Sequence, residues 1–152
     1  MKINFVKTHP DAVIPTRGSA GAAGFDLTAV SLRRAADIYI YDIGIAMEIP
    51  AGYFAAIFPR SSIFFTGLEL TNCVGVIDSD FRAPISAIFR EVPGDRIAQL
   101  IIQPCAVPTI HHILHPEDGQ NSLIAMEAIE FVETDVLSTT ARGCQGYGST
   151  GR

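Results

Sequence analysis

The chain consists of short apolar segments separated by glycine and proline, and this pattern predicts a protein built mainly from β-strands. Clear turns are expected at 50–52 and 92–95, each lying between two apolar segments. Strand spacing of this kind is typical of a sandwich or a barrel. The segments expected to form strands are Lys2–Lys7, Phe25–Ala29, Ile38–Tyr41, Ile43–Ile49, Tyr53–Phe58, Leu68–Asn72, Val74–Ile77, Ile85–Phe89, Arg96–Ile102 and Ile129–Val132.

The pattern departs from strands in three places. One short helix is expected from Ser61, whose hydroxyl can cap the first turn. Residues 107–128 form a long excursion before the last strand, and from Ser138 onward the chain is small, polar and glycine-rich, as mobile tails are. We therefore expect one β domain over residues 1–137, with a loop insertion near 107–128, and a flexible tail over residues 138–152.

Composition narrows the classes of function. The 152 residues are enough for one domain with a sizeable core. Only 18% of the residues are charged and 48% are apolar, which hints that part of the surface is buried in an oligomer. The net charge of -5 argues against nucleic-acid binding, which requires a basic face. Nine of the cationic side chains are arginine, which suits bidentate contacts to phosphate and leaves room for a local anion site.

The cysteines and the hydropathy pattern indicate a compartment. Cys73, Cys105 and Cys144 have no Cys-x-x-Cys spacing, so a disulfide framework or a zinc site is not expected, and a reducing compartment is favoured. The N-terminus has no signal-peptide pattern, and no apolar run approaches the length of a membrane span. The sequence predicts a soluble, cytoplasmic protein without membrane contact.

The segment from Asn72 to Arg82 carries the strongest candidate chemistry. An apolar strand leads into the carboxylates of Asp78 and Asp80, turns after Phe81 and returns as an alternating strand. Such a hairpin can hold one acidic group, one aromatic ring and several backbone amides around a small flat ligand. Taken alone it would be an ordinary turn, because Asp and Ser are common turn residues.

The tail carries a second candidate. Its glycines at 146, 148 and 151 match the spacing GxGxxG, but that match is spurious because the dinucleotide motif must follow a strand and open a helix. What remains is one guanidinium at Arg142, one ring at Tyr147 and two hydroxyls, which could fold over a nucleotide. Composition alone would favour a disordered solubilising tail.

Three weaker candidates lie elsewhere. Arg60 with the following serines opens the short helix and can form an anion site, although a capped helix with a surface arginine would look the same. Gln99 shares a face with Ile97 and needs a partner, either backbone or substrate phosphate, since an unpaired buried amide costs about 1–3 kcal/mol. Asp26 lies in an apolar strand, where it is either a satisfied buried carboxylate or outer-shell support for a metal or an arginine.

These five segments, centred on Asp26, Arg60, Asp78, Gln99 and Arg142, occur in the order and approximate spacing of the five signature motifs of trimeric dUTPases. The chain resembles that family over nearly its whole length. The resemblance implies an all-β, antiparallel jelly-roll or β-barrel-like subunit with one short helix, assembled as a homotrimer. Active sites would be shared between subunits: one contributes the first, second and fourth motifs, a second the hairpin, and a third its tail.

The same resemblance implies an activity. The reaction would be Mg²⁺-dependent hydrolysis of dUTP to dUMP and pyrophosphate, by attack of water on the α-phosphorus. This reaction limits uracil in DNA and supplies dUMP for thymidylate synthesis. The metal would be held mainly by the substrate phosphates, with Asp26 in its outer shell through water.

Residue roles follow from the resemblance as well. Asp78 would be the general base, and Arg142 and Gln99 would be the other catalytic residues. The phosphates would be held by Arg60, Ser61 and Ser62. The deoxyuridine would be held by Asn72, Val76, Ile77, Phe81 and Ser86, and the tail would close through Tyr147, Gly148, Ser149 and Thr150.

Several positions depart from the family pattern. Phe81 replaces the usual tyrosine but keeps the ring that packs beneath the deoxyribose. Tyr147 replaces the phenylalanine that caps the uracil. Ala83 replaces a glycine and would be strained if the turn needs a positive φ. Residues 107–128 form a longer segment than is usual between the last two motifs.

Two alternative functions remain at this point. dCTP deaminase shares the fold and an Arg-Ser-Ser segment, but it should carry a catalytic glutamate at the hairpin in place of Asp78. A different class is a regulatory protein that binds a protein partner through residues 107–128, as some phage members of the family bind regulators. Because Asp78 and Arg142 are both present, hydrolysis is favoured and a protein partner would be additional to it.

Overall fold

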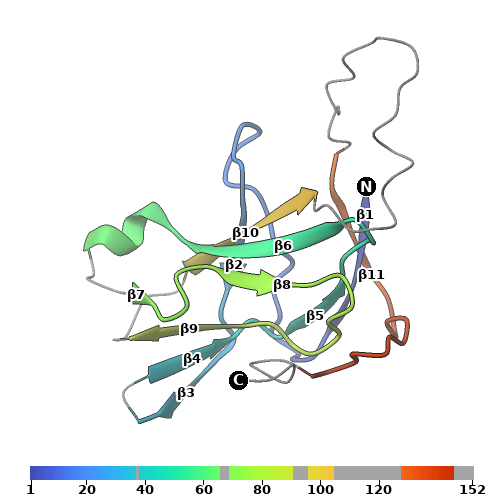
Figure 1. Cartoon of the computed structure of the whole chain (residues 1–152). Coiled ribbons are helices and arrows are strands. Elements are labelled where there is room, and N and C mark those ends of the chain that lie inside the picture. The colour runs from blue at the N-terminus through green and yellow to red at the C-terminus, as the bar shows by residue number, and fades with distance from the viewer. Residues whose placement is uncertain (37, 66–68, 91–95, 105–127, 146–152) are drawn as a thin grey trace.

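The computed structural model describes residues 1–36, 38–65, 69–90, 96–104 and 128–145, and this part of the chain is almost entirely β-structure (Figure 1). The single helix within these ranges is η1, a 3₁₀ helix over Ser61–Phe65. The strands are β1 (Lys2–Lys7), β2 (Phe25–Thr28), β3 (Ser31–Ala35), β4 (Ile38–Asp42), β5 (Ile45–Glu48), β6 (Tyr53–Pro59), β7 (Glu69–Leu70), β8 (Gly75–Ile77), β9 (Ser86–Arg90), β10 (Arg96–Pro104) and β11 (Glu130–Glu133).

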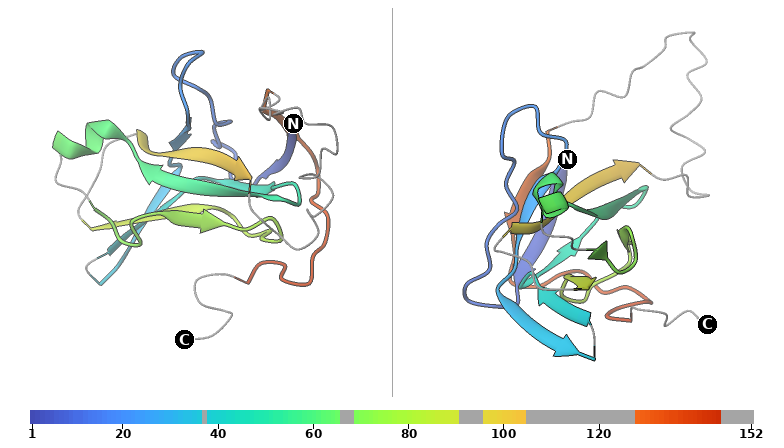
Figure 2. Two further views of the ribbon diagram at one scale, coloured as in Figure 1. Left: turned by 45° about the horizontal axis from the view of Figure 1, so that its top comes forward. Right: turned by 90° about the vertical axis from the view of Figure 1, so that its left-hand side faces the viewer.

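The strands form three small sheets that pack around a common interior (Figures 1 and 2). Their orders are β11-β1-β5, β2-β10-β6-β8 and β3-β4-β9-β7. The ladders are antiparallel except for β1 and β11, which run parallel. The all-β prediction is therefore confirmed, and the one expected helix is present as a short 3₁₀ turn from Ser61.

The predicted strands match the observed ones closely, with differences of one to a few residues at their ends. One strand, β3, was not predicted. All five of its residues are exposed, so it has no alternation between apolar and polar positions from which a strand could be recognised. It exists because it pairs with β4 along its whole length.

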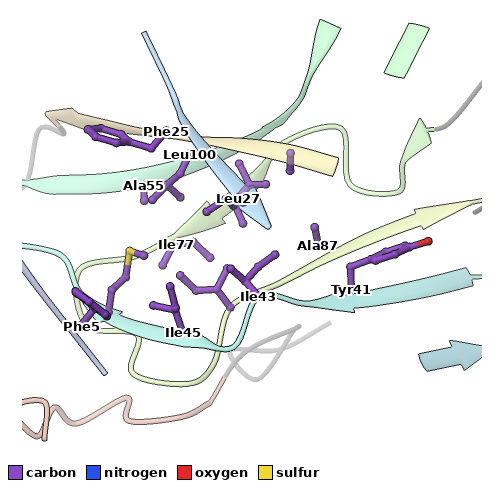
Figure 3. Close-up of a cluster of buried hydrophobic side chains, with 14 of the residues drawn as sticks. Phe5, Phe25, Leu27, Tyr41, Ile43, Ile45, Ala55, Ile77, Ala87 and Leu100 are labelled. Atoms are coloured by element: carbon purple, nitrogen blue, oxygen red, sulfur yellow. The ribbon is translucent and has the colours of Figure 1, made fainter. Parts of the chain in front are cut away.

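The core is formed by apolar residues that alternate along the strands (Figure 3). In β1, Ile3 and Phe5 are fully buried while Lys2 and Lys7 are exposed. Figure 3 shows side chains from all three sheets converging on one cluster. Burying an aliphatic or aromatic side chain of this size contributes about 1.5–3 kcal/mol each.

The pairing of β6 with β8 determines where the candidate residues lie. The two strands are antiparallel, with Ile77 opposite Ala55 and Gly75 opposite Ile57. Helix η1 begins where β6 ends, and the hairpin begins where β8 ends. The two segments therefore emerge at opposite ends of this strand pair, as Figure 1 shows.

Within the described part of the chain there is no helix that is long and apolar enough to span a membrane.

Candidate active site

The hairpin between β8 and β9 is held in place by backbone hydrogen bonds. The N–H of Phe81 donates to the carbonyl of Asp78 at 3.1 Å, which closes the turn. At the far side, the N–H of Ile85 donates to the carbonyl of Ile45 at 2.8 Å, and the N–H of Ile43 donates to the carbonyl of Ile85 at 3.0 Å. These bonds fasten the turn to the core, so the side chains at its tip have a defined position.

A cavity of about 200 Å³ opens beside this hairpin. Phe81 is 8% exposed and contributes its ring both to the core and to the cavity wall. The volume is below the roughly 300–1,000 Å³ of sites for drug-sized ligands, so it suits a single base better than a whole nucleotide. The lining residues are Ile57, Asn72, Gly75, Val76, Ile77, Phe81, Pro84, Ile85, Ser86 and Arg142.

Arg142 brings the tail to the hairpin. Its Nη1 donates a hydrogen bond to Oδ2 of Asp78 and lies 3.3 Å from Oδ1 of Asp80. Its guanidinium carbon is 5.8 Å from the centre of the Phe81 ring, within the range of a cation–π contact. Asp78 and Asp80 are about half exposed, at 47% and 53%, so water reaches both carboxylates.

The carboxylates of Asp78 and Asp80 stabilise the positive charge of Arg142. The hydrogen bond from Arg142 to Asp78, followed by the negative charges of Asp78 and Asp80, raises the pKa of the guanidinium above its already high value. Arg142 is therefore cationic at any pH at which the protein is folded. A fixed cation next to a base-sized cavity is suited to a ligand that carries phosphate.

A second group of polar side chains lies at the other end of β6. Nε of Arg60 and Oδ1 of Asp26 form an ion pair at 3.0 Å, with both side chains mostly buried. Nε2 of Gln99 donates to the carbonyl of Pro59 at 3.3 Å. The partner of Gln99 is thus backbone in this structure, and Asp26 supports an arginine, one of the two outer-shell roles considered for it.

Gly24 packs closely against the side chain of Gln99. A Cβ added at Gly24 would lie 2.8 Å from Oε1 and 3.2 Å from Cβ of Gln99, so only glycine leaves room for the amide. Ser61 and Ser62 are exposed at the start of η1, next to Arg60. Arg60, Ser61 and Ser62 therefore stand together at one accessible end of the sheet.

These two groups do not meet within one chain. None of Arg60, Ser61, Ser62 and Gln99 lines the cavity at the hairpin. Asp78 follows Ile77, which pairs with Ala55, whereas Arg60 follows the last residue of β6. The separation along the strand is about six residues, or roughly 20 Å at about 3.3 Å per residue.

No group of three or more metal-ligating side chains is found within the residues that the structure describes. The carboxylates of Asp26 and Asp78 are each bonded to an arginine. This donor set suits a cation that arrives on a substrate and is reached through water. Mg²⁺ commonly binds in this way, keeping several waters and using substrate phosphates as ligands.

The structure places most of the predicted site residues as follows. Asn72, Val76, Ile77, Phe81 and Ser86 all line the cavity, together with Arg142. Tyr147, Gly148, Ser149 and Thr150, and residues 107–127 of the insertion, lie outside the described residues.

Two details of the hairpin and the tail bear on the predictions from sequence. The non-glycine residues with positive φ in the described part of the chain are Ala36 and Cys73, so Ala83 does not carry the strain considered for it. Residues 138–145 pack against the hairpin of their own chain, through Arg142 and Thr140, whose Oγ1 donates to the carbonyl of Asp80. Arg142 and Asp78 thus lie in contact within the chain, and the contribution of a tail from another subunit stays a prediction.

Sequence reasoning did not single out Arg82, Glu48 or Ser138, although the three form a connected cluster behind the hairpin. The only signal available was the position of Arg82 in the hairpin segment itself. Glu48 ends a strand and Ser138 starts the tail, and neither position stands out in the sequence.

Known proteins match this chain over most of its length. The family model described as dUTPase matches residues 10–122. A deoxyuridine 5'-triphosphate nucleotidohydrolase of Wolinella succinogenes is 35% identical, over 100% of this chain and 95% of that protein. One of the same name from Yarrowia lipolytica is 34% identical, over 99% of this chain and 88% of that protein.

Solved structures share the fold. The dUTPase of Streptococcus mutans is 27% identical with a TM-score of 0.57, covering 68% of this chain and 97% of that one. The dUTPase of Staphylococcus aureus phage phi11 has a TM-score of 0.61 over 76% of this chain and 98% of that one, and at 18% identity it supports the fold alone. The jelly-roll-like subunit is confirmed, and the chain belongs to the dUTPase family.

Proposed function

We propose that this protein hydrolyses dUTP to dUMP and pyrophosphate by attack of water on the α-phosphorus. The observation that carries the proposal is the juxtaposition at the hairpin. There, a cavity of base size has the Phe81 ring in its wall and the Arg142 guanidinium at its edge, bonded to the partly exposed carboxylate of Asp78. Membership of the dUTPase family supports the same substrate.

The base and the sugar are bound by the hairpin. Uracil enters the cavity, where the backbone of Val76 and Ile77 and the side chains of Asn72 and Ser86 can pair with its polar edge. The Phe81 ring lies beneath the deoxyribose and leaves no room for a 2′-hydroxyl. A site that depends on fit to polar edges discriminates strongly, because a mismatched ligand leaves buried polar groups unpaired.

Hydrolysis uses Asp78 and Arg142 as a pair. In this structure, Nη1 of Arg142 donates a hydrogen bond to Oδ2 of Asp78. Binding of the triphosphate provides a stronger anionic partner, so the guanidinium moves to the phosphates and Oδ2 becomes free to accept a proton from water. The water oxygen then bonds to the α-phosphorus, the bond from that phosphorus to the bridging oxygen breaks, and pyrophosphate leaves with the electron pair.

The phosphates require the second group of residues. Arg60, Ser61, Ser62 and Gln99 are suited to hold them, but they lie roughly 20 Å along the strand from Asp78 of the same chain. A triphosphate is much shorter than this span. The complete site therefore combines the hairpin of one chain with Arg60 of another, as in the homotrimer that we propose for the assembly.

Mg²⁺ is the proposed cofactor. Bound to the substrate phosphates, it would neutralise part of their charge and so favour attack by water. Asp26 would support it from the outer shell through water, while its Oδ1 remains paired with Arg60. The residues of the chain then act by orienting the phosphates, and Asp78 acts by accepting the proton.

The residues after Gln145 are proposed to cover the bound nucleotide. Residues 146–152 would close over the shared site, with Tyr147 stacking on the uracil and Gly148, Ser149 and Thr150 contacting the phosphates. The protein would act in the cytoplasm, where removing dUTP limits uracil in DNA and supplies dUMP for thymidylate synthesis. A protein partner for residues 107–128 would be additional to this activity.

The test is a product analysis with dUTP, dCTP, dTTP and UTP, each supplied with Mg²⁺. We expect dUMP and pyrophosphate from dUTP alone, and loss of that activity in Asp78→Asn. Conversion of dCTP to a uracil nucleotide would place the protein with the deaminases instead. No turnover of any of the four would contradict an enzymatic role and favour one based on protein binding.

A further inference from the structure

Arg82 is the most completely bonded cation in the part of the chain that the structure describes, and no step of the proposed reaction uses it. Its side chain is only 10% exposed. Nη1 donates to the carbonyls of Ser79 and Phe81 at 2.7 and 3.0 Å, and Nε donates to the carbonyl of Ser138 at 2.9 Å. Nη2 donates to Oγ of Ser138 at 3.3 Å and lies 3.5 Å from the carboxylate of Glu48.

These contacts join three segments that are distant in sequence: the hairpin tip, the end of β5 and the start of the tail. Ser138 is bound twice by Arg82 and also donates a hydrogen bond from Oγ to Glu48. A guanidinium has five N–H donors in a fixed plane, and here they point at two carbonyls of the hairpin and at Ser138 and Glu48. The direction in which the tail leaves the hairpin is thereby set.

A second set of hydrogen bonds binds the tail to the hairpin between Ser138 and Arg142. Oγ1 of Thr140 donates to the carbonyl of Asp80 at 2.6 Å and accepts the N–H of Gly143 at 3.0 Å. The carbonyl of Gly143 accepts the backbone N–H of Arg82 at 2.9 Å. Gly143 has a φ of 55°, which glycine adopts without strain, and this tight turn points Arg142 back at Asp78.

We propose that Arg82 is a positioning residue, which anchors Ser138 on the hairpin so that Arg142, four residues further along the chain, is delivered to Asp78. The proposal rests on the proposed function to the extent that Arg142 acts on the triphosphate. Arg82 itself is not among the residues that line the cavity at the hairpin. Holding Arg142 in place matters for the rate, because a catalytic cation that is displaced by a fraction of a bond length stabilises the transition state less.

The first test needs no substrate. Between Arg96 and the C-terminal Arg152 the sequence has no lysine or arginine except Arg142, so tryptic cleavage in this region reports on Arg142 alone. Held in its ion pair, Arg142 is protected from the protease. In the full-length, assembled protein, Arg82→Gln should speed this cleavage by at least about tenfold, measured by intact mass. The control Arg33→Gln, at an arginine 63% exposed on the edge strand β3, should leave it unchanged.

The second test separates positioning from a structural role in the hairpin. Arg82→Gln should lower kcat for dUTP by about tenfold or more with a smaller effect on KM. In an Arg142→Ala background the same change should cost less than about twofold, because the residue that it positions is already gone. A purely structural role would instead give independent, additive losses in the double variant.

The outcomes are distinct. A folded Arg82→Gln protein with tail cleavage at the wild-type rate, or with additive losses, overturns the proposal. If Arg82→Gln does not fold, Ser138→Ala decides, since it leaves the bonds of Arg82 to Ser79 and Phe81 in place. It should speed cleavage by about threefold, and an unchanged rate would overturn the proposal. If the wild-type protein leaves dUTP intact, the proposed function fails, while the protease test still decides on the anchor.

Discussion

Two inactive variants, Asp78→Asn and Arg60→Gln, are expected to recover dUTP hydrolysis when they assemble together in one oligomer. In one chain, Ile77 pairs with Ala55, so Asp78 lies level with Phe54, six residues before Arg60. At about 3.3 Å per residue this is roughly 20 Å. On the proposed function, we therefore expect a triphosphate whose α-phosphorus is at Asp78 to meet Arg60 of another copy.

The size of the recovery follows from the geometry. Asp78→Asn removes a general base, worth about 10²–10⁴ in rate, and Arg60→Gln removes a cation that holds phosphate, worth about 10²–10³. A mixed site works when its hairpin comes from the Arg60→Gln chain and its arginine from the Asp78→Asn chain. In the proposed trimer, every assembly that contains both chains has one such site in three, so about a third of the wild-type kcat should return.

The assay is pyrophosphate release by hetero-oligomers, prepared by refolding the two chains together and purified through a different tag on each. The control replaces the Asp78→Asn chain by one carrying both substitutions. No site can then contain Arg60, and activity should remain at the level of the parents. Hetero-oligomers that carry both tags but hydrolyse dUTP no faster than either parent would refute the reasoning from strand register.

Two further changes test single contacts. The hydrogen bond from Ser138 holds the pKa of Glu48 below its ordinary value, so this carboxylate stabilises the fold above about pH 4.3 and loses that effect as the pH falls through its folded pKa. Glu48→Gln should thus lower the free energy of unfolding by about 1–2 kcal/mol at pH 7, and this difference from the wild-type protein should become smaller in acid. Denaturant titrations over a pH series measure it. A difference that does not change with pH would contradict the reasoning. Gly24→Ala puts a methyl group 2.8 Å from Oε1 of Gln99 and should lower kcat/KM for dUTP by about tenfold. The control Gly21→Ala, where an added Cβ has nothing within 4 Å, should leave kcat/KM unchanged. Equal values of kcat/KM for the two variants would argue against a role for the position of Gln99.

Local sequence patterns were sufficient for most of the strands and for the hairpin that carries Asp78. Alternation of apolar and polar residues predicts β1, and the apolar run into Asp78 predicts the hairpin, because both depend on residues that are neighbours in the chain. Ser61 marks the helix start for the same reason. Strand β3 shows the limit: it is exposed throughout and is a strand only because β4 lies beside it.

The partners of the polar residues were decided by the tertiary structure. Arg142 and Asp78 are 64 residues apart in the chain, and Arg82 and Ser138 are 56 apart. A period of two identifies a strand but does not state which strand it pairs with or in which register, and these choices determine which charged side chains meet. For the same reason the sequence contained Arg60 and Asp78 as candidates for one site, and only the antiparallel register of β6 and β8 placed them at opposite ends of the sheet.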